Sequence, residues 1–180
     1  FVFWSCHRKE NMLSEKRMRG IFESLLEMTD VNFFCSVLPS TQMAAEKYGY
    51  ADRLKKAKHI IWEPCLPKYT DALRLMLESD LVLTDSGGMQ EECAALHIPC
   101  LTLGYVTDRP ESVEAGANKC VGCEKGNIVN EVRNVLNSKS AAEKMRKAEN
   151  PYGDGKASPR IFGIIEKFEG KMERWEKKVR

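Results

Sequence analysis

Thr84-Asp85-Ser86-Gly87-Gly88-Met89-Gln90-Glu91-Glu92 joins a short apolar run, residues 80–83, to a segment of helical composition that ends before His97-Ile98-Pro99. A strand that runs through Ser-Gly-Gly into a helix gathers backbone N–H groups and the positive helix end around one small concave site. The glycines let the backbone approach a ligand because no Cβ atom stands in the way. This stretch therefore predicts a site for a phosphate or pyrophosphate, with Glu92 placed to accept both hydroxyls of a ribose. A plain strand-to-helix turn capped by Ser86 is the alternative.

Apolar runs and amphipathic stretches alternate on both sides of this turn. Strands are predicted at residues 1–5, 31–37, 59–62, 81–84, 100–103 and 119–121. Helices are predicted at residues 15–28, 41–47, 51–58, 70–78, 89–96, 127–136 and 159–175, with a further one opening at Asp108. Such alternation is typical of a parallel sheet covered by helices on both faces. The chain is therefore predicted to be an α/β protein with a Rossmann-like sheet that binds ligands at the carboxyl ends of its strands.

Length and composition restrict the class of protein. With 180 residues the chain is long enough for one domain with a sizeable core. A formal net charge of +2, with both signs interspersed, argues against nucleic acid as a partner. No apolar run approaches the roughly 20 residues of a membrane span, so no membrane partner is expected. We expect a cytoplasmic protein, and the start of the chain at Phe1, inside a predicted strand, indicates a domain of a longer protein.

The cysteines point to structural rather than chemical roles. There are seven, an odd number, and most lie in apolar segments, so buried and reduced thiols are expected rather than a disulfide framework. Cys120 and Cys123 have the spacing of a zinc or redox pair. No second pair accompanies them, and neither His59 nor His97 stands at a metal-binding spacing from them. We therefore predict no metal and no cofactor.

The central stretch, together with Arg109-Pro110-Glu111 and Glu114-Ala115-Gly116, resembles the non-hydrolysing UDP-N-acetylglucosamine 2-epimerases. His7-Arg8-Lys9-Glu10-Asn11 and Asn150-Pro151-Tyr152-Gly153-Asp154-Gly155 match the same family in the same order. The matches span nearly all of this chain but only the C-terminal half of such an enzyme. The resemblance implies one half of a glycosyltransferase-B-type architecture, with a UDP-binding domain at residues 1–156. Residues 157–180 would form an amphipathic helix that packs on the N-terminal half in two-domain relatives.

The resemblance also implies an isomerase reaction, the interconversion of UDP-GlcNAc and UDP-ManNAc for the biosynthesis of cell-surface polysaccharides. The proton at C2 is abstracted, UDP is eliminated to leave a 2-acetamidoglucal, and UDP adds again after reprotonation on the other face. The UDP-binding half must stabilise the negative charge that grows on the leaving diphosphate. The acidic residues assigned to proton transfer lie in the other half, so this chain alone is expected to be inactive.

By this resemblance His7 is a catalytic residue, able to donate to a phosphate oxygen or to shuttle a proton. The implied ligands of the UDP-sugar are Arg8, Asn11, Ser86, Gly87, Gly88, Glu92 and Arg109. The guanidinium of Arg109 can pair with a diphosphate in a bidentate way. From the residues alone, a loop histidine and a surface arginine bonded to a carboxylate are the plainer interpretations. Asp85 is expected to brace the Ser-Gly-Gly turn, and Glu91 to face solvent or to support the site.

Four positions depart from the family pattern: Leu38, Ser40, Ala72 and Gly104. Each change removes a contact or a charge from the ligand side, which leaves the identity of the sugar open. Two other functions also stay open, a nucleotide-sugar-binding module without catalysis and the donor-binding domain of a UDP-sugar glycosyltransferase. The Gly-Gly-Met-Gln-Glu-Glu run favours the epimerase over the glycosyltransferase.

The last predicted helix carries an apolar face at helical spacing. Its members are Ile161, Ile164, Ile165, Phe168, Met172 and Trp175. A contiguous apolar strip tends to find a partner. In this chain we expect the helix to pack against a second copy, giving a homodimer, or to fold back on its own sheet.

Overall fold

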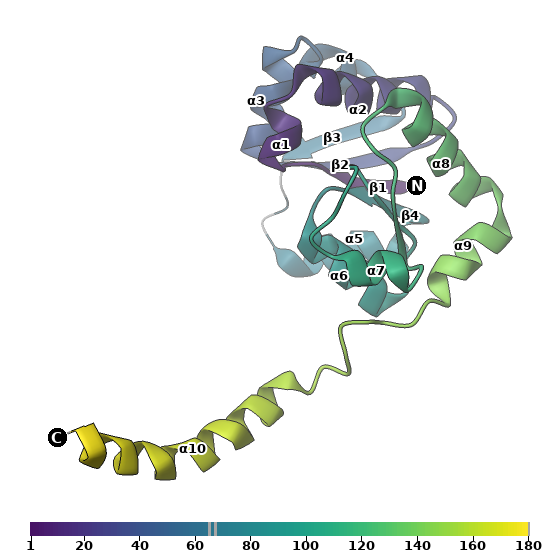
Figure 1. Ribbon diagram of the computed structural model, residues 1–180. Helices are drawn as coiled ribbons and strands as arrows, with labels where there is room; N and C mark the ends of the chain where they lie inside the picture. The colour runs from purple at the N-terminus through teal and green to yellow at the C-terminus, as the bar shows by residue number, and fades with distance from the viewer. Residues whose placement is uncertain (65, 67, 180) are drawn as a thin grey trace.

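The computed structural model of this chain describes residues 1–64, 66 and 68–179, with side chains through residue 168. The described residues form one sheet of six parallel strands in the order β3-β2-β1-β4-β5-β6 (Figure 1). The strands are β1 (Val2–Ser5), β2 (Phe33–Val37), β3 (Ile60–Pro64), β4 (Leu81–Thr84), β5 (Cys100–Thr102) and β6 (Asn118–Cys120). From the centre of the sheet, β1, β2 and β3 follow one another in one direction, and β4, β5 and β6 follow in the other. This reversal of order opens a crevice at the carboxyl ends of β1 and β4. The Rossmann-like fold predicted from the sequence is confirmed.

Each strand and helix predicted from the sequence is present, with ends that differ by a few residues. The helices are α1 (Lys9–Met12), α2 (Glu15–Glu27), α3 (Pro39–Lys47), α4 (Ala51–Lys56), α5 (Tyr69–Glu78), α6 (Gly87–Leu96), α7 (Pro110–Glu114), α8 (Lys125–Asn137), α9 (Lys139–Arg146) and α10 (Ala157–Val179). Neither α1 nor α9 is predicted from the sequence. Helix α9 has eight residues, a stretch too short for apolar periodicity to distinguish a helix from other structure.

The alternation of side chains along β1 divides the apolar core between the two faces of the sheet. Val2 and Trp4 pack in a core with α2, α3, α4 and α8, whereas Phe3 packs in a second core with α5 and α6. Figure 1 shows these two groups of helices on opposite sides of the sheet. Because helices cover both faces, the ends of the strands are the parts of the sheet open to a ligand.

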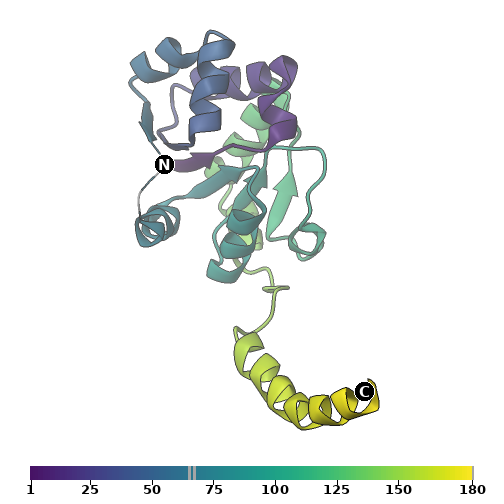
Figure 2. The same ribbon diagram turned by 90° about the vertical axis from the view of Figure 1, so that its left-hand side faces the viewer.

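The last helix, α10, stands away from the sheet in both views (Figures 1 and 2). Its side chains are 51–64% exposed at Ile161, Phe162, Ile164, Ile165 and Phe168. The expectation that this helix folds back on its own sheet is therefore wrong for the side chains that the structure describes. The side chains of Met172 and Trp175 lie outside that part.

The physical reason lies in the turn that precedes α10. The side chain of Asn150 donates from Nδ2 to the carbonyl oxygen of Gly153 at 3.0 Å. The Asp154 carboxylate then accepts from both terminal nitrogens of Arg160, at 2.9 and 2.8 Å. These contacts tie the first turn of α10 to the connecting segment rather than to the sheet.

Candidate functional site

The turn between β4 and α6 has the geometry that its sequence predicts. Ser86 caps α6, with its Oγ accepting from the N–H of Met89 at 3.5 Å, while the Ser86 N–H donates to Thr84 Oγ1 at 3.0 Å. Gly87 and Gly88 follow as the first helical residues, whose N–H groups have no intrahelical acceptor. Among the described residues neither N–H has another protein acceptor. The Ser cap therefore leaves two N–H groups at the start of α6 free to bind an anion.

Two arginine side chains converge on this turn from other loops of the same sheet edge. A Cβ placed on Gly87 would lie 3.5 Å from Arg8 Nη2 and 3.7 Å from both Cγ and Cζ of Arg109. Arg8 follows β1 and Arg109 follows β5, so the carboxyl ends of three strands contribute to one site. Of the residues predicted to bind a ligand, the structure brings these two arginines together at the Ser-Gly-Gly turn. The end of the helix dipole and the two guanidiniums place three groups that favour an anion at one turn.

Each guanidinium is paired with a carboxylate of the chain. Arg8 Nη1 donates to Asp108 Oδ1 at 2.6 Å and its Nη2 to Asp108 Oδ2, while Arg109 Nε donates to Glu91 Oε1. The hydrogen bond from Arg8 lowers the pKa of Asp108 and raises that of Arg8 itself. Glu91, expected to face solvent or to support the site, thus holds Arg109. The part played by Asp108 is not predicted from the sequence, because 100 residues separate it from Arg8.

Asp85 fixes the loop that follows β1 and carries His7 and Arg8. It is 2% exposed and accepts from the backbone N–H groups of His7 and Arg8, at 2.8 and 2.9 Å. Cys6 Sγ also donates to it, and burial raises the pKa of this thiol well above its ordinary value, which keeps it a donor. The sequence analysis expects Asp85 to brace its own turn. The structure corrects this: the carboxylate braces the loop of His7 and Arg8, because β1 and β4 are neighbours in the sheet.

Asn11, predicted to contact the ligand, lies behind the site rather than in it. It is 1% exposed, and its Nδ2 donates to Asp85 Oδ2 and to the carbonyl oxygen of Leu103, both at 3.0 Å. Its Oδ1 lies 3.4 Å from both Arg17 Nη1 and Cys123 Sγ. Because its amide is bonded to these partners, Asn11 supports the site from behind. The sequence predicts instead that it contacts the ligand.

His7 lies at the edge of the site, beside Arg8. Its side chain is 34% exposed, and its Nδ1 is 3.7 Å from Asp85 Oδ1, without a hydrogen-bond partner among the described residues. The imidazole borders a hollow of about 550 Å³ between α1 and α3, whose walls include Met12, Met43 and the basic side chain of Lys47. The position leaves the ring accessible from the crevice side of the sheet.

Glu92, the predicted ribose ligand, faces a tyrosine that the sequence analysis does not identify. Glu92 Oε1 accepts from the Tyr69 hydroxyl at 2.8 Å, and this hydrogen bond raises the pKa of Tyr69. Tyr69 is 63% exposed and begins α5, so it stands at the same strand edge as the turn. The sequence does offer one signal for Tyr69: it is an aromatic residue at the start of the helix that precedes β4.

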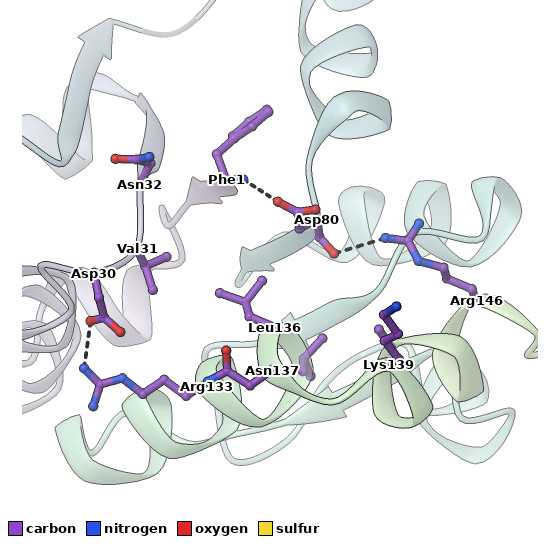
Figure 3. A pocket seen from close by; sticks show the side chains of 12 residues that line it. Phe1, Asp30, Val31, Asn32, Asp80, Arg133, Leu136, Asn137, Lys139 and Arg146 are labelled. Atoms are coloured by element: carbon purple, nitrogen blue, oxygen red, sulfur yellow. Dashed lines mark hydrogen bonds and ion pairs between the residues drawn. The ribbon is translucent and has the colours of Figure 1, made fainter.

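A separate hollow of about 420 Å³ lies at the amino ends of the strands (Figure 3). Within it Arg133 donates to the Asp30 carboxylate at 2.8 Å, and Arg146 donates to the backbone carbonyl oxygen of Asp80 at 3.4 Å. This is the edge of the sheet opposite the Ser-Gly-Gly turn. We assign no ligand to it.

The described residues offer no place for a metal ion, since no three of their His, Cys, Asp or Glu side chains are grouped suitably. Their six cysteines are free thiols, five of them buried, as the sequence analysis expects for that part of the chain; Cys65 lies outside the described residues. No helix in the same part has both the length and the apolar character to cross a membrane.

Comparison with known proteins gives one family. A sequence profile described as UDP-N-acetylglucosamine 2-epimerase matches residues 1–166. The chain is 38% identical over 169 residues to the UDP-N-acetylglucosamine 2-epimerase of Methanocaldococcus jannaschii, covering 92% of this chain and 44% of that protein. To the Bacillus subtilis protein of the same name it is 38% identical over 165 residues, covering 89% and 42%. The chain therefore spans less than half the length of these relatives.

Solved structures agree with the sequence comparison. The M. jannaschii epimerase in complex with UDP-GlcNAc and UDP matches with a TM-score of 0.82 and 36% identity, over 92% of this chain and 44% of that one. The S. aureus MnaA–UDP structure matches with a TM-score of 0.82 and 32% identity, over 94% and 46%. A spinosyn rhamnosyltransferase shares the fold alone, with a TM-score of 0.56 and 18% identity over 81% and 40%. Sequence and structure together show that this chain belongs to the UDP-N-acetylglucosamine 2-epimerase family.

Proposed function

We propose that this chain is the UDP-binding C-terminal half of a UDP-N-acetylglucosamine 2-epimerase, which interconverts UDP-GlcNAc and UDP-ManNAc. One observation carries the proposal: two guanidiniums, from Arg8 and Arg109, flank Gly87 at the N-terminus of α6. Free backbone N–H groups, a helix dipole and guanidiniums that can pair in a bidentate way together favour the binding of a pyrophosphate. The solved M. jannaschii relative, in complex with UDP-GlcNAc and UDP, supports the choice of ligand.

In this proposal the diphosphate lies on the N–H groups of Gly87 and Gly88, beside the Ser86 hydroxyl and Arg109. Glu92 accepts the ribose hydroxyls in place of the Tyr69 hydroxyl that it holds in the free protein. The chain's contribution to the reaction is electrostatic. When the bond between C1 of the sugar and the diphosphate breaks, negative charge grows on UDP, and fixed donors that face this charge lower the barrier.

His7 stands where it could donate to a phosphate oxygen or move a proton, and it is proposed as this chain's catalytic residue. The groups that remove and return the proton at C2 are proposed to come from the other half of the full-length protein. The isolated chain then binds UDP without turning over a UDP-sugar. Since the six described cysteines are free thiols, the proposed location is the cytoplasm, where nucleotide sugars feed cell-surface polysaccharide synthesis.

The domain arrangement follows from the exposed helix. Residues 1–156 are proposed as the UDP-binding domain, and residues 157–180 as a helix that packs on the other half of the full-length protein. The exposed side chains of Ile161, Ile164, Ile165 and Phe168 support this, because they form an apolar face without a partner in the described chain. In the isolated chain the same face is proposed to pair with a second copy.

The test of the catalytic proposal compares the full-length protein with this chain, using UDP-GlcNAc as substrate. We expect the full-length protein to form UDP-ManNAc, the chain alone to form neither product nor free UDP, and His7→Asn to lower kcat of the full-length protein by roughly 100-fold or more. Turnover by the isolated chain, lost on His7→Asn, would contradict the division of labour. A full-length protein that binds UDP-GlcNAc but converts none of it would instead be a binding module.

A further inference from the structure

The two arginines proposed to hold the diphosphate are both occupied in the free protein. Arg8 uses both terminal nitrogens on the Asp108 carboxylate, and Arg109 uses Nε on Glu91. The guanidinium edge that fits a carboxylate in this way is the edge that fits a phosphate. A diphosphate and the Asp108 carboxylate therefore cannot use the same edge of Arg8 at one time.

The arginines are held in place by bonds that do not involve these carboxylates. The backbone N–H of Arg8 donates to the buried Asp85, and that of Arg109 donates to Thr107 Oγ1 at 3.0 Å. Gln90, which is 1% exposed, in turn accepts from the Thr107 hydroxyl at 2.5 Å. These bonds fix the backbone of both arginines, and Arg109 Nη1 also donates to the backbone carbonyl oxygen of Asp108 at 3.0 Å. The backbone at both positions would thus stay at the turn if the carboxylate partners moved away.

The carboxylates are the more exposed members of the two pairs. The Asp108 side chain is 56% exposed against 25% for Arg8, and the Glu91 side chain is 41% exposed against 35% for Arg109. Among the described residues, neither carboxylate accepts a hydrogen bond from any side chain other than its arginine. Rotation of either one into water leaves no other protein donor unsatisfied.

We propose that Asp108 and Glu91 are stand-in anions, which neutralise Arg8 and Arg109 in the free protein and are displaced by the diphosphate of the ligand. This inference rests on the proposed function. It makes the two carboxylates specificity-determining residues, since only a ligand that brings its own negative charge can release the guanidiniums. A nucleoside without phosphate gains nothing from the exchange. The opposite possibility is that Asp108 orients Arg8 toward the phosphate, and it predicts the opposite sign.

The experiment is an NMR titration of UDP into the parent chain, Asp108→Asn and Glu91→Gln, with uridine as a ligand that lacks phosphate. Asp108→Asn removes the competing charge and keeps the side-chain shape, so we expect UDP to bind roughly threefold to tenfold more tightly. Glu91→Gln acts separately on Arg109 and should give a gain of the same sign. Uridine binding should not change in either variant.

The matched control is Asp30→Asn. It removes one negative charge and one pair with an arginine, Arg133, at the opposite edge of the sheet, where the Nη2–Oδ1 distance is 2.8 Å. Its affinity for UDP should equal that of the parent. As a second readout, Asp108→Asn should lower the thermal midpoint of the free protein, because Arg8 then keeps only its looser ion pair with Glu10, at 3.7 Å. UDP should raise the thermal midpoint of this variant by more than it raises that of the parent.

The outcomes separate this inference from the proposed function. If the parent binds UDP and both variants bind it equally or more weakly, the carboxylates orient the arginines and the inference is overturned while the binding site stands. An equal gain for UDP and uridine would also overturn it, because the effect would then not depend on phosphate. If neither the parent nor any variant binds UDP, both proposals fail.

Discussion

The Asp85 carboxylate joins two loops that are 78 residues apart, through its hydrogen bond from the backbone N–H of His7. It is buried, and a buried charge is tolerated only when donors surround it. Here the donors are two backbone N–H groups, the Asn11 amide and the Cys6 thiol. The position of His7 and Arg8 at the carboxyl edge therefore depends on a residue that no ligand touches.

Asp85→Asn should destabilise the fold and weaken UDP binding together. The asparagine keeps the shape, but it turns an amide donor toward groups that are themselves donors. Since hydrogen bonds to a charged group contribute about 1.5–3 kcal/mol each, a loss of at least about 2 kcal/mol is expected in the free energy of unfolding, measured in urea.

Ser5→Ala is the control for that variant. Ser5 is fully buried in β1, and its hydroxyl has no hydrogen-bond partner among the described residues. Removing the hydroxyl should leave stability unchanged or slightly raised. Equal losses for Ser5→Ala and Asp85→Asn would show that burial, rather than the carboxylate network, sets the cost.

Local sequence predicts those site residues whose role follows from their neighbours in the chain. Ser86, Gly87 and Gly88 belong to one turn, and their geometry follows from a strand, two glycines and a helix. The pairing of Arg8 with Asp108 spans 100 residues, so it depends on strand order and loop shape. Asn11 shows the same limit, because the resemblance of its motif does not reveal which side chains turn inward.

At the scale of one element, the loop between β5 and α7 is held in place by Tyr105. Its hydroxyl donates to Glu124 Oε1 at 2.5 Å, and Arg17 Cζ lies 5.3 Å from the centre of its ring. The loop also carries Asp108 and Arg109, so Tyr105 ties a proposed phosphate ligand, Arg109, and the carboxylate of Asp108 to the start of α8. The contacts link three elements that the sequence places far apart.

The Tyr105 hydroxyl should titrate unusually late. Its hydrogen bond to Glu124 raises the pKa of Tyr105 to about 12, because ionisation would set two negative charges side by side. The folded-state pKa is raised, so the stabilisation is fully present below the ordinary tyrosine pKa of about 10 and is lost as the pH rises through about 12. An ultraviolet absorbance titration, with Tyr105→Phe to identify the signal, measures the shift.

Glu124→Gln tests the cause of that shift. The variant keeps an acceptor but removes the charge, so the Tyr105 titration should return toward its ordinary range. If the Tyr105 signal titrates at the same pH in the parent and in Glu124→Gln, the hydrogen bond to Glu124 is not what holds the loop.

At the scale of the whole molecule, α10 presents an apolar face to solvent. Burying one large side chain of this kind stabilises an assembly by roughly 1.5–3 kcal/mol, so several together favour association. We expect the isolated chain to sediment as a weak dimer, and Ile164→Glu with Phe168→Glu to make it a monomer. Gly163→Glu adds one negative charge on the opposite side of the helix, where a Cβ meets nothing within 4 Å, and should leave the dimer intact. A parent chain that sediments as a monomer at high concentration would rule the pairing out.

The sequence predicts more of the fold than of the site. The strands and helices follow from apolar runs and helical periodicity, and alternating strands and helices imply a parallel sheet. The direction of α10 could not be predicted, because a hydrophobic pattern shows that a helix has an apolar face but not what that face packs against. Helix α9 has only eight residues, so its apolar pattern is too short to predict a helix.

An NMR titration of the isolated chain with UDP tests the central claim most directly, because it reports which backbone amides meet the ligand. We predict affinity of roughly millimolar order, about −4 kcal/mol, with the largest shifts at Ser86, Gly87 and Gly88. Gly88→Val should block the approach of the diphosphate without disturbing the fold, since only Ser86 Oγ lies as near as 4.0 Å to the added Cβ. Gly126→Val, at the second position of α8 with nothing within 4 Å, should bind UDP like the parent. Shifts confined to the hollow at the amino ends of the strands, or equal binding by Gly88→Val and the parent, would contradict the claim.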